Sequence, residues 1–91
     1  MKVRSVQESP RFLRDIKRIK KRGLDLGKLR QVVTLLSEKK PLPPRCRDHA
    51  LTGNWTGHRD CHIQPDWLLI YKIDGDDIIL ERTGTHSDLF G

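Results

Sequence analysis

Apolar residues in the first forty positions recur first at the spacing of a strand and then at the spacing of two helices. Residues 3–8 alternate imperfectly between apolar and polar side chains, which predicts a short strand. Ser9 and Pro10 form a typical helix start, and apolar residues then recur at helical spacing over residues 10–22. A second amphipathic stretch follows Asp25, which can cap its first turn, and ends before a group of prolines. The pattern therefore predicts a strand followed by a helical hairpin.

The second half of the chain begins with a long connection and continues with three strands. Residues 41–55 have no strong periodicity, and a connection of that length in so small a domain is usually functional or disordered. Strands are predicted at 57–64, 67–73 and 77–83, and the middle one is apolar enough to be buried on both faces. This element order predicts an α+β fold. We expect a small, mostly antiparallel four-stranded sheet that packs on the N-terminal helical hairpin.

Length and composition fit a single domain over residues 1–91. Charged residues make up 33% and hydrophobic residues 35% of the chain, and the hydrophobic ones are clustered, which argues against disorder. No apolar run approaches the ~20 residues of a membrane span, and the N-terminus has no signal-peptide pattern, so we expect a cytoplasmic protein. Cys46 and Cys61 lack the spacing of metal-binding pairs, and we expect free thiols.

Charge is divided unevenly along the chain. Residues 1–45 contain 14 Lys and Arg against 4 Asp and Glu, whereas residues 46–91 contain 4 against 8 and hold all four histidines. A strongly basic half without a wide apolar face favours binding to nucleic acid over binding to a membrane. The alternative is that these charges only form the solvated surface of the helices.

The second half concentrates side chains that exchange protons or bind phosphate. Strand ends and loops meet in a meander, so we expect the proton-transfer segments to converge. Histidine suits both proton roles of a metal-independent RNA cleavage in which the 2′-hydroxyl is the nucleophile. Arginine suits the phosphate because its fork binds two oxygens, and Arg59 and Arg82 are the candidates. The proton-transfer candidates are Asp48, His49, Asp60, His62, Asp66 and His86.

Each candidate also has a structural alternative. Trp67 fits a core position better than a stacking platform, and Arg82 can form an ion pair with Glu81 or Asp88. Zinc binding by His49, His62, Asp66 and His86 ranks lower, because no pair has the tight spacing of known zinc motifs. The remaining alternatives are a loop-capping pair at Asp48 and His49, a solvated strand face at His62, and an ordinary turn residue at Asp66.

Two stretches resemble YafQ-type toxins of the RelE/ParE superfamily of bacterial toxin–antitoxin systems. The first is residues 48–71, DHALTGNWTGHRDCHIQPDWLLIY, and the second is the tail, residues 81–91, ERTGTHSDLFG. The basic hairpin and the proline-rich connection also fit, so the resemblance covers nearly the whole chain. It implies a ribosome-dependent endoribonuclease that cuts messenger RNA in the decoding site and has no cofactor.

The resemblance also assigns roles and partners. It favours His49 as general base and His86 as general acid, and around them it places His62, Asp66, Trp67 and Phe90. The implied partners are a DinJ-like antitoxin, in a heterotetrameric complex, and the ribosome with its message, but no membrane. The basic residues predicted to bind ribosomal RNA lie on the first helix: Arg11, Arg14, Lys17, Arg18 and Lys21.

Two other functions stay open at this point. ParE-type relatives inhibit DNA gyrase as binding proteins, and a basic module of this size could also bind RNA without cutting it. The three histidines His49, His62 and His86 favour the nuclease, because a gyrase inhibitor has no need of three placed proton carriers.

Overall fold

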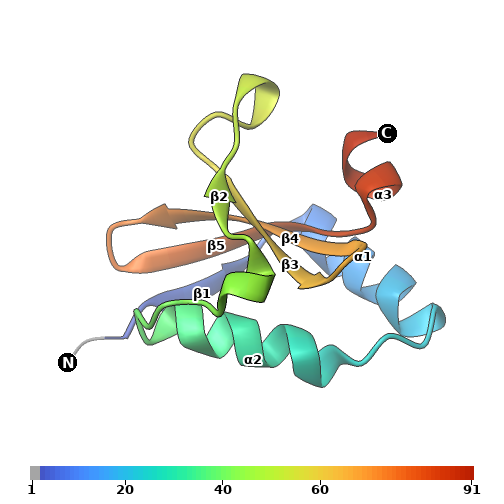
Figure 1. Cartoon of the computed structure of the whole chain (residues 1–91), viewed down its shortest axis with the longest axis horizontal. Helices are drawn as coiled ribbons and strands as arrows, with labels where there is room; N and C mark the ends of the chain where they lie inside the picture. Colours follow the sequence, from blue (N-terminus) through green and yellow to red (C-terminus); the bar gives the residue numbers. More distant parts are fainter. Residues whose placement is uncertain (1–2) are drawn as a thin grey trace.

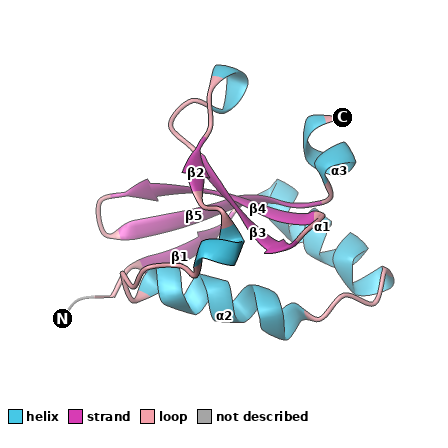
Figure 2. Ribbon diagram, in the orientation of Figure 1, coloured by secondary structure: helices cyan, strands magenta, loops and turns pink. Residues whose placement is uncertain are grey.

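The protein forms a five-stranded mixed sheet with helices on both of its sides (Figures 1 and 2). The structure, a computed structural model, describes residues 3–91. In chain order the elements are β1 (Ser5–Glu8), α1 (Pro10–Lys21), α2 (Leu26–Ser37), the 3₁₀ turn η1 (Pro44–Cys46), β2 (His49–Ala50), the 3₁₀ turn η2 (Gly53–Trp55), β3 (Arg59–Gln64), β4 (Trp67–Asp74), β5 (Asp77–Gly84) and α3 (His86–Phe90).

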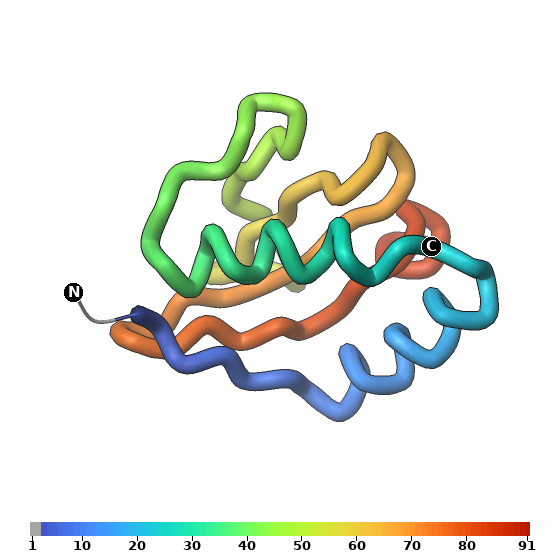
Figure 3. The backbone as a smooth tube through the Cα atoms, turned by 90° about the horizontal axis from the view of Figure 1, so that it is seen from below, coloured from blue at the N-terminus to red at the C-terminus, as the bar shows by residue number. Residues whose placement is uncertain are grey.

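The predicted helix starts are confirmed. Ser9 caps α1, because its Oγ accepts a hydrogen bond from the Phe12 N–H at 3.0 Å, and Asp25 caps α2 by accepting from Gly27 N–H at 2.8 Å. Between the helices Gly23 has φ +76°, a conformation that favours glycine and ends α1. The two helices run in opposite directions from this joint, as Figure 3 shows.

The sheet order is β1-β5-β4-β3-β2. All neighbouring strands are antiparallel except β1 and β5, which are parallel. The predicted α+β class and the buried central strand are confirmed, because residues 67–71 of β4 are buried. The predicted number of four strands is one too small: β2 pairs His49 with Asp60 and Ala50 with Arg59 at the far edge. Two residues are too few to produce a periodic pattern.

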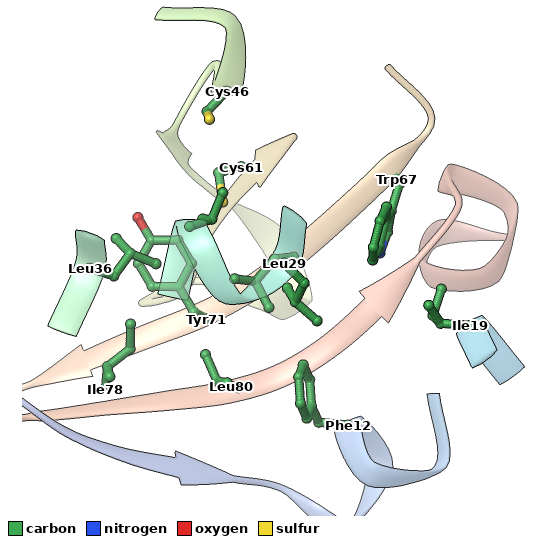
Figure 4. Packing of buried hydrophobic residues seen from close by; sticks show 12 residues of the cluster. Phe12, Ile19, Leu29, Leu36, Cys46, Cys61, Trp67, Tyr71, Ile78 and Leu80 are labelled. Atoms are coloured by element: carbon green, nitrogen blue, oxygen red, sulfur yellow. The ribbon is translucent and has the colours of Figure 1, made fainter. Parts of the chain in front are cut away.

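The main core lies between the sheet and the helices α1 and α2 (Figure 4). Phe12 and Ile19 from α1 and Leu29 and Leu36 from α2 pack there against alternate residues of the strands, including Tyr71. A smaller cluster on the other side consists of Leu68, Ile70 and Leu89, with Leu51 and Trp55 against it. That second cluster fixes α3 and the η2 segment on the face of the sheet opposite to α1 and α2 (Figure 1).

Two further findings concern the cysteines and the membrane. Cys46 and Cys61 are buried and free, as predicted. Over residues 3–91 no helix has the length and apolar character needed to cross a membrane.

Candidate active site

Three sequence-predicted residues share the face of the sheet that α3 covers. In β3, Asp60 and His62 alternate with Cys61, which packs in the main core, so their side chains leave the sheet on the opposite face. The register pairs His49 of β2 with Asp60 and His62 with Leu68, and Leu68 belongs to the smaller cluster. Directly opposite residues point to the same face, so His49 joins this group.

His86 and Asp66 meet at the end of the same face. His86 is the first residue of α3, and Asp66 lies in the turn between β3 and β4. His86 Nδ1 lies 2.7 Å from Asp66 Oδ1, and the His86 backbone N–H donates to the same oxygen at 3.1 Å. These bonds hold the pKa of Asp66 below its usual range. The ring centroids of His62 and His86 are 5.7 Å apart, so the predicted convergence of His62, Asp66 and His86 is present in the structure.

His49 is held in a different way. Its Nδ1 lies 2.8 Å from the carbonyl oxygen of Arg47, which can only accept a hydrogen bond. Nδ1 therefore carries the proton in the neutral ring, and Nε2 keeps a free lone pair. Arg47 has φ 47°, in the left-handed region, which turns its carbonyl towards the ring. The His49 side chain is 55% exposed, so its Nε2 can reach a ligand.

Asp60, a proton-transfer candidate to which the sequence assigned no separate role, is buried beside His49. It is 4% exposed, and its Oδ1 lies 3.0 Å from His49 Nδ1 without meeting hydrogen-bond geometry. Burial raises the pKa of Asp60, and the nearby His49, His62 and His86 act in the opposite direction. Asp60 therefore lies close to the histidines of this face. In the sequence, Asp60 could be linked to the site by its position two residues before His62 on a predicted strand, which puts both side chains on one face.

Phe90 and Trp67, predicted to contact substrate, differ in position. Phe90 is 48% exposed and its ring centroid lies 6.5 Å from that of His86, so it remains a candidate for contact with a base. Trp67 is 2% exposed and donates its Nε1–H to Thr83 Oγ1 at 2.9 Å within the core. Its indole N–H is therefore used inside the core, and direct contact of Trp67 with substrate stays a prediction.

The two predicted phosphate-binding arginines are engaged elsewhere. Arg59 alternates with Asp60 and points to the other face, where it pairs with Asp48 at 3.0 Å. Tyr71 donates to the same carboxylate, so this cluster ties the connection before β2 to the sheet. Arg82 pairs with Asp15 of α1 at 2.7 Å, and its side chain is 12% exposed. These ion pairs give both arginines a structural role, and their contact with substrate stays a prediction.

The basic residues predicted on α1 are all exposed. Arg18 lies 3.6 Å from both Asp15 and Asp88, which offsets part of its charge. Within the described residues 3–91, no ion pair involves the other four predicted residues: Arg11, Arg14, Lys17 and Lys21. Their charges are available to a polyanion.

Comparison with known proteins identifies the family. Residues 4–91 match the family described as bacterial toxin of type II toxin–antitoxin system, YafQ. The chain belongs to this family. It is 45% identical over 89 residues to the mRNA interferase toxin YafQ of Escherichia coli K12, and the match covers 97% of each chain.

Solved structures agree with this assignment. YafQ from E. coli BL21(DE3) is 44% identical with a TM-score of 0.92, covering 97% of this chain and 99% of that one. The E. coli DinJ–YafQ toxin–antitoxin complex contains a chain that is 45% identical, with a TM-score of 0.89 and coverage of 97% and 98%. A metal-bound toxin from Helicobacter pylori is 40% identical, with a TM-score of 0.89 and coverage of 94% and 98%. In residues 3–91 of the present chain, no group of three or more His, Cys, Asp or Glu side chains is arranged to hold a metal ion.

Proposed function

We propose that this protein is the toxin of a type II toxin–antitoxin system and an endoribonuclease that cuts messenger RNA on the ribosome. The similar E. coli protein named mRNA interferase toxin supports the reaction class. The observation that carries the mechanism is the contrast between two histidines. His49 Nδ1 makes its hydrogen bond to the Arg47 carbonyl, with the Asp60 carboxylate at 3.0 Å but outside hydrogen-bond geometry, whereas His86 Nδ1 is hydrogen-bonded to the Asp66 carboxylate.

This contrast supports the assignment of base and acid. His49 has a free Nε2 lone pair, so it takes the proton from the RNA 2′-hydroxyl. The 2′-oxygen attacks the phosphorus, and the bond from phosphorus to the 5′-oxygen breaks. Asp66 holds His86 through Nδ1, so Nε2 is the ring atom that gives a proton to the leaving 5′-oxygen. The products are a 2′,3′-cyclic phosphate and a 5′-hydroxyl.

His62, Asp66 and Asp60 support this reaction without a metal. His62 lies beside His86 and can stabilise charge on the phosphoryl oxygens, while Asp66 orients His86 through two hydrogen bonds to one oxygen. Asp60 is buried beside His49, and burial raises its pKa. Imidazole and carboxylate side chains are sufficient for every proton transfer of the mechanism.

Partners and location follow from the same proposal. The E. coli complex supports a DinJ-like antitoxin as the partner of this chain, and we propose a heterotetramer. The exposed basic residues of α1 support contact with ribosomal RNA. A toxin that acts on translating ribosomes works in the cytoplasm.

One experiment separates the nuclease from its alternatives. Purified protein is mixed with translating ribosomes, and transcript ends are mapped, with His49→Ala and His86→Ala beside the wild type. Cuts within the message that need both histidines support the proposal. Intact transcripts together with inhibition of gyrase would show a ParE-like activity, and intact transcripts with RNA binding alone would show a non-catalytic module.

A further inference from the structure

The candidate active site continues into an open groove around the β3–β4 end of the sheet. The groove has a volume of about 970 Å³ and begins at His62, Asp66 and His86. Among the described residues that line it, Asp66 is the only carboxylate. The cations that line it come from the end of α1, from α2 and from the segment around η1: Arg22, Lys28, Arg45 and Arg47. Arg22 is paired with Asp88, but the other three cations still outnumber the one carboxylate among the described lining residues, so the groove is basic.

A smaller cavity of about 300 Å³ adjoins the groove. The two share Lys28, Arg45 and Ile63, and no histidine lines the smaller one. One of its walls is the face of α2 on which Gln31 and Leu35 follow Lys28 at helical spacing. The opposite wall is the segment around η1, which lies between α2 and the sheet (Figure 1).

The lining of the cavity matches one nucleotide. Val32, Leu35 and Ile63 are apolar, and the Gln31 amide is the polar group on the α2 side. Its volume is at the lower end of the range of ligand pockets, which suits a ligand as small as a nucleobase. Lys28 and Arg45 are exposed, and over residues 3–91 neither has an ion-pair partner.

We propose that the groove and the cavity bind single-stranded RNA, with one unstacked base in the cavity and flanking phosphates on Lys28 and Arg45. Proteins recognise single strands in this way, by holding a splayed base against apolar side chains and by balancing phosphates with cations. The inference rests on the proposed nuclease function. Because the groove starts at His62 and His86, the strand is the message that is cut, and the cavity holds a base at a fixed distance from the cut.

The first test measures the salt dependence of binding. A fluorescent single-stranded RNA oligonucleotide is titrated with the full protein at several salt concentrations. Lys28→Gln and Arg45→Gln should each lower the slope of log affinity against log salt by about 0.7, the value for one phosphate on a single strand. Lys72→Gln removes an exposed charge of β4 outside the groove and should leave the slope unchanged. Equal slopes for all three variants would overturn the proposal.

The second test locates the base. Single-turnover cleavage on ribosomes is measured with messages that carry one abasic nucleotide at successive positions. In the wild type, one position should slow cleavage at least several-fold. Gln31→Trp closes the mouth of the cavity from an exposed position, so it should slow cleavage of the intact message and remove this dependence. A wild type insensitive at every position, while Lys28→Gln and Arg45→Gln still weaken ribosome binding, would identify ribosomal RNA as the strand and overturn the assignment to the message.

The two tests separate this inference from the proposed function. If wild-type protein does not cut messages on ribosomes, the function proposed above fails, and the oligonucleotide titration still decides whether the groove binds RNA. If the wild type cuts and both groove variants cut and bind as Lys72→Gln does, only the present inference fails.

Discussion

Arg22, the residue that follows α1, holds Asp88 of α3 with both terminal nitrogens, at 2.6 and 3.1 Å. Asp88 also accepts from the Thr85 backbone N–H and completes a capping box with Thr85. A five-residue helix has little stability of its own, so these contacts keep α3 on the sheet. They therefore control the position of His86, which begins that helix.

Loss of the Asp88 carboxylate should detach α3 and slow cleavage. Asp88→Ala removes the cap and the ion pair, with a cost of about 1 kcal/mol for the cap. The hydrogen bonds from Arg22 are the main reason why the pKa of Asp88 lies below its usual range. Its stabilising effect is thus complete above about pH 4 and is lost as the pH falls further. Amide exchange of α3 against pH checks this, with Arg30→Ala as a control for loss of one exposed charge. Unchanged protection in Asp88→Ala would contradict it.

His86→Ala should abolish cleavage and leave the fold intact. The side chain is 55% exposed, and an exposed substitution usually costs within ~0.5 kcal/mol. A general acid contributes typically ~10²–10⁴-fold in rate. The variant should keep its melting temperature, bind ribosomes and antitoxin, and lose toxicity. Ser87→Ala, at the next exposed position of α3, is the matched control. Single-turnover cleavage near the wild-type rate would remove His86 from the mechanism.

Asp60→Asn should slow cleavage while stability at pH 7 stays equal or rises. Burial raises the pKa of Asp60, so its ionised form costs stability as the pH rises from about 4 through that raised value. The amide avoids this cost but no longer places a negative charge next to His49. We expect a rate loss smaller than the ~10²-fold of a lost proton-transfer group, with an altered pH–rate profile. Thermal unfolding and cleavage are measured together. An unchanged profile, or a loss of stability that accounts for the loss of rate, would oppose the positioning role.

Charge reversal on α1 should weaken binding to ribosomes. The triple variant Arg14→Glu, Lys17→Glu and Lys21→Glu removes three exposed cations that have no ion-pair partner among residues 3–91. Each phosphate that is no longer neutralised should lower the salt dependence of binding by about one unit. Circular dichroism should show an unchanged fold. Binding equal to that of the wild type at both low and high salt would exclude α1 from the interface.

Cleavage should need no metal ion. The proposed mechanism uses imidazole and carboxylate side chains only, whereas a similar H. pylori toxin has been solved in a metal-bound form. Activity should survive EDTA when magnesium is buffered to keep ribosomes intact. Elemental analysis of the purified protein provides a second readout, and a stoichiometric metal at the histidines would contradict the mechanism.

Part of this site could be predicted from the sequence. His62 and Asp66 flank one predicted turn, and His86 follows the strand next to it, so a meander had to bring them near one another. The antiparallel pairing of β4 with both neighbours was available from strand spacing and the Asp-Gly turn. The local sequence pattern was therefore sufficient to predict those parts of the site that depend on hairpin geometry.

The rest depends on contacts between distant residues. Arg82 has its partner Asp15 on α1, 67 positions earlier, so the sequence could not show that it was engaged. Asp60 is buried in β3 opposite His49 of β2, and β2 is too short to be predicted from periodicity. The direction of Trp67 depends on the strand register, which shifts between His62 and Gln64.

The pairing of β1 with β5 has a consequence for when the toxin becomes active. Ser5 lies opposite Asp77 and Glu8 opposite Leu80, so the first strand has its sheet partner only after about seventy more residues have been made. The helix that carries His86 follows later still. A nascent chain therefore has no assembled active site until β5 and α3 have been made. This delay leaves time for an antitoxin to meet the chain as it folds.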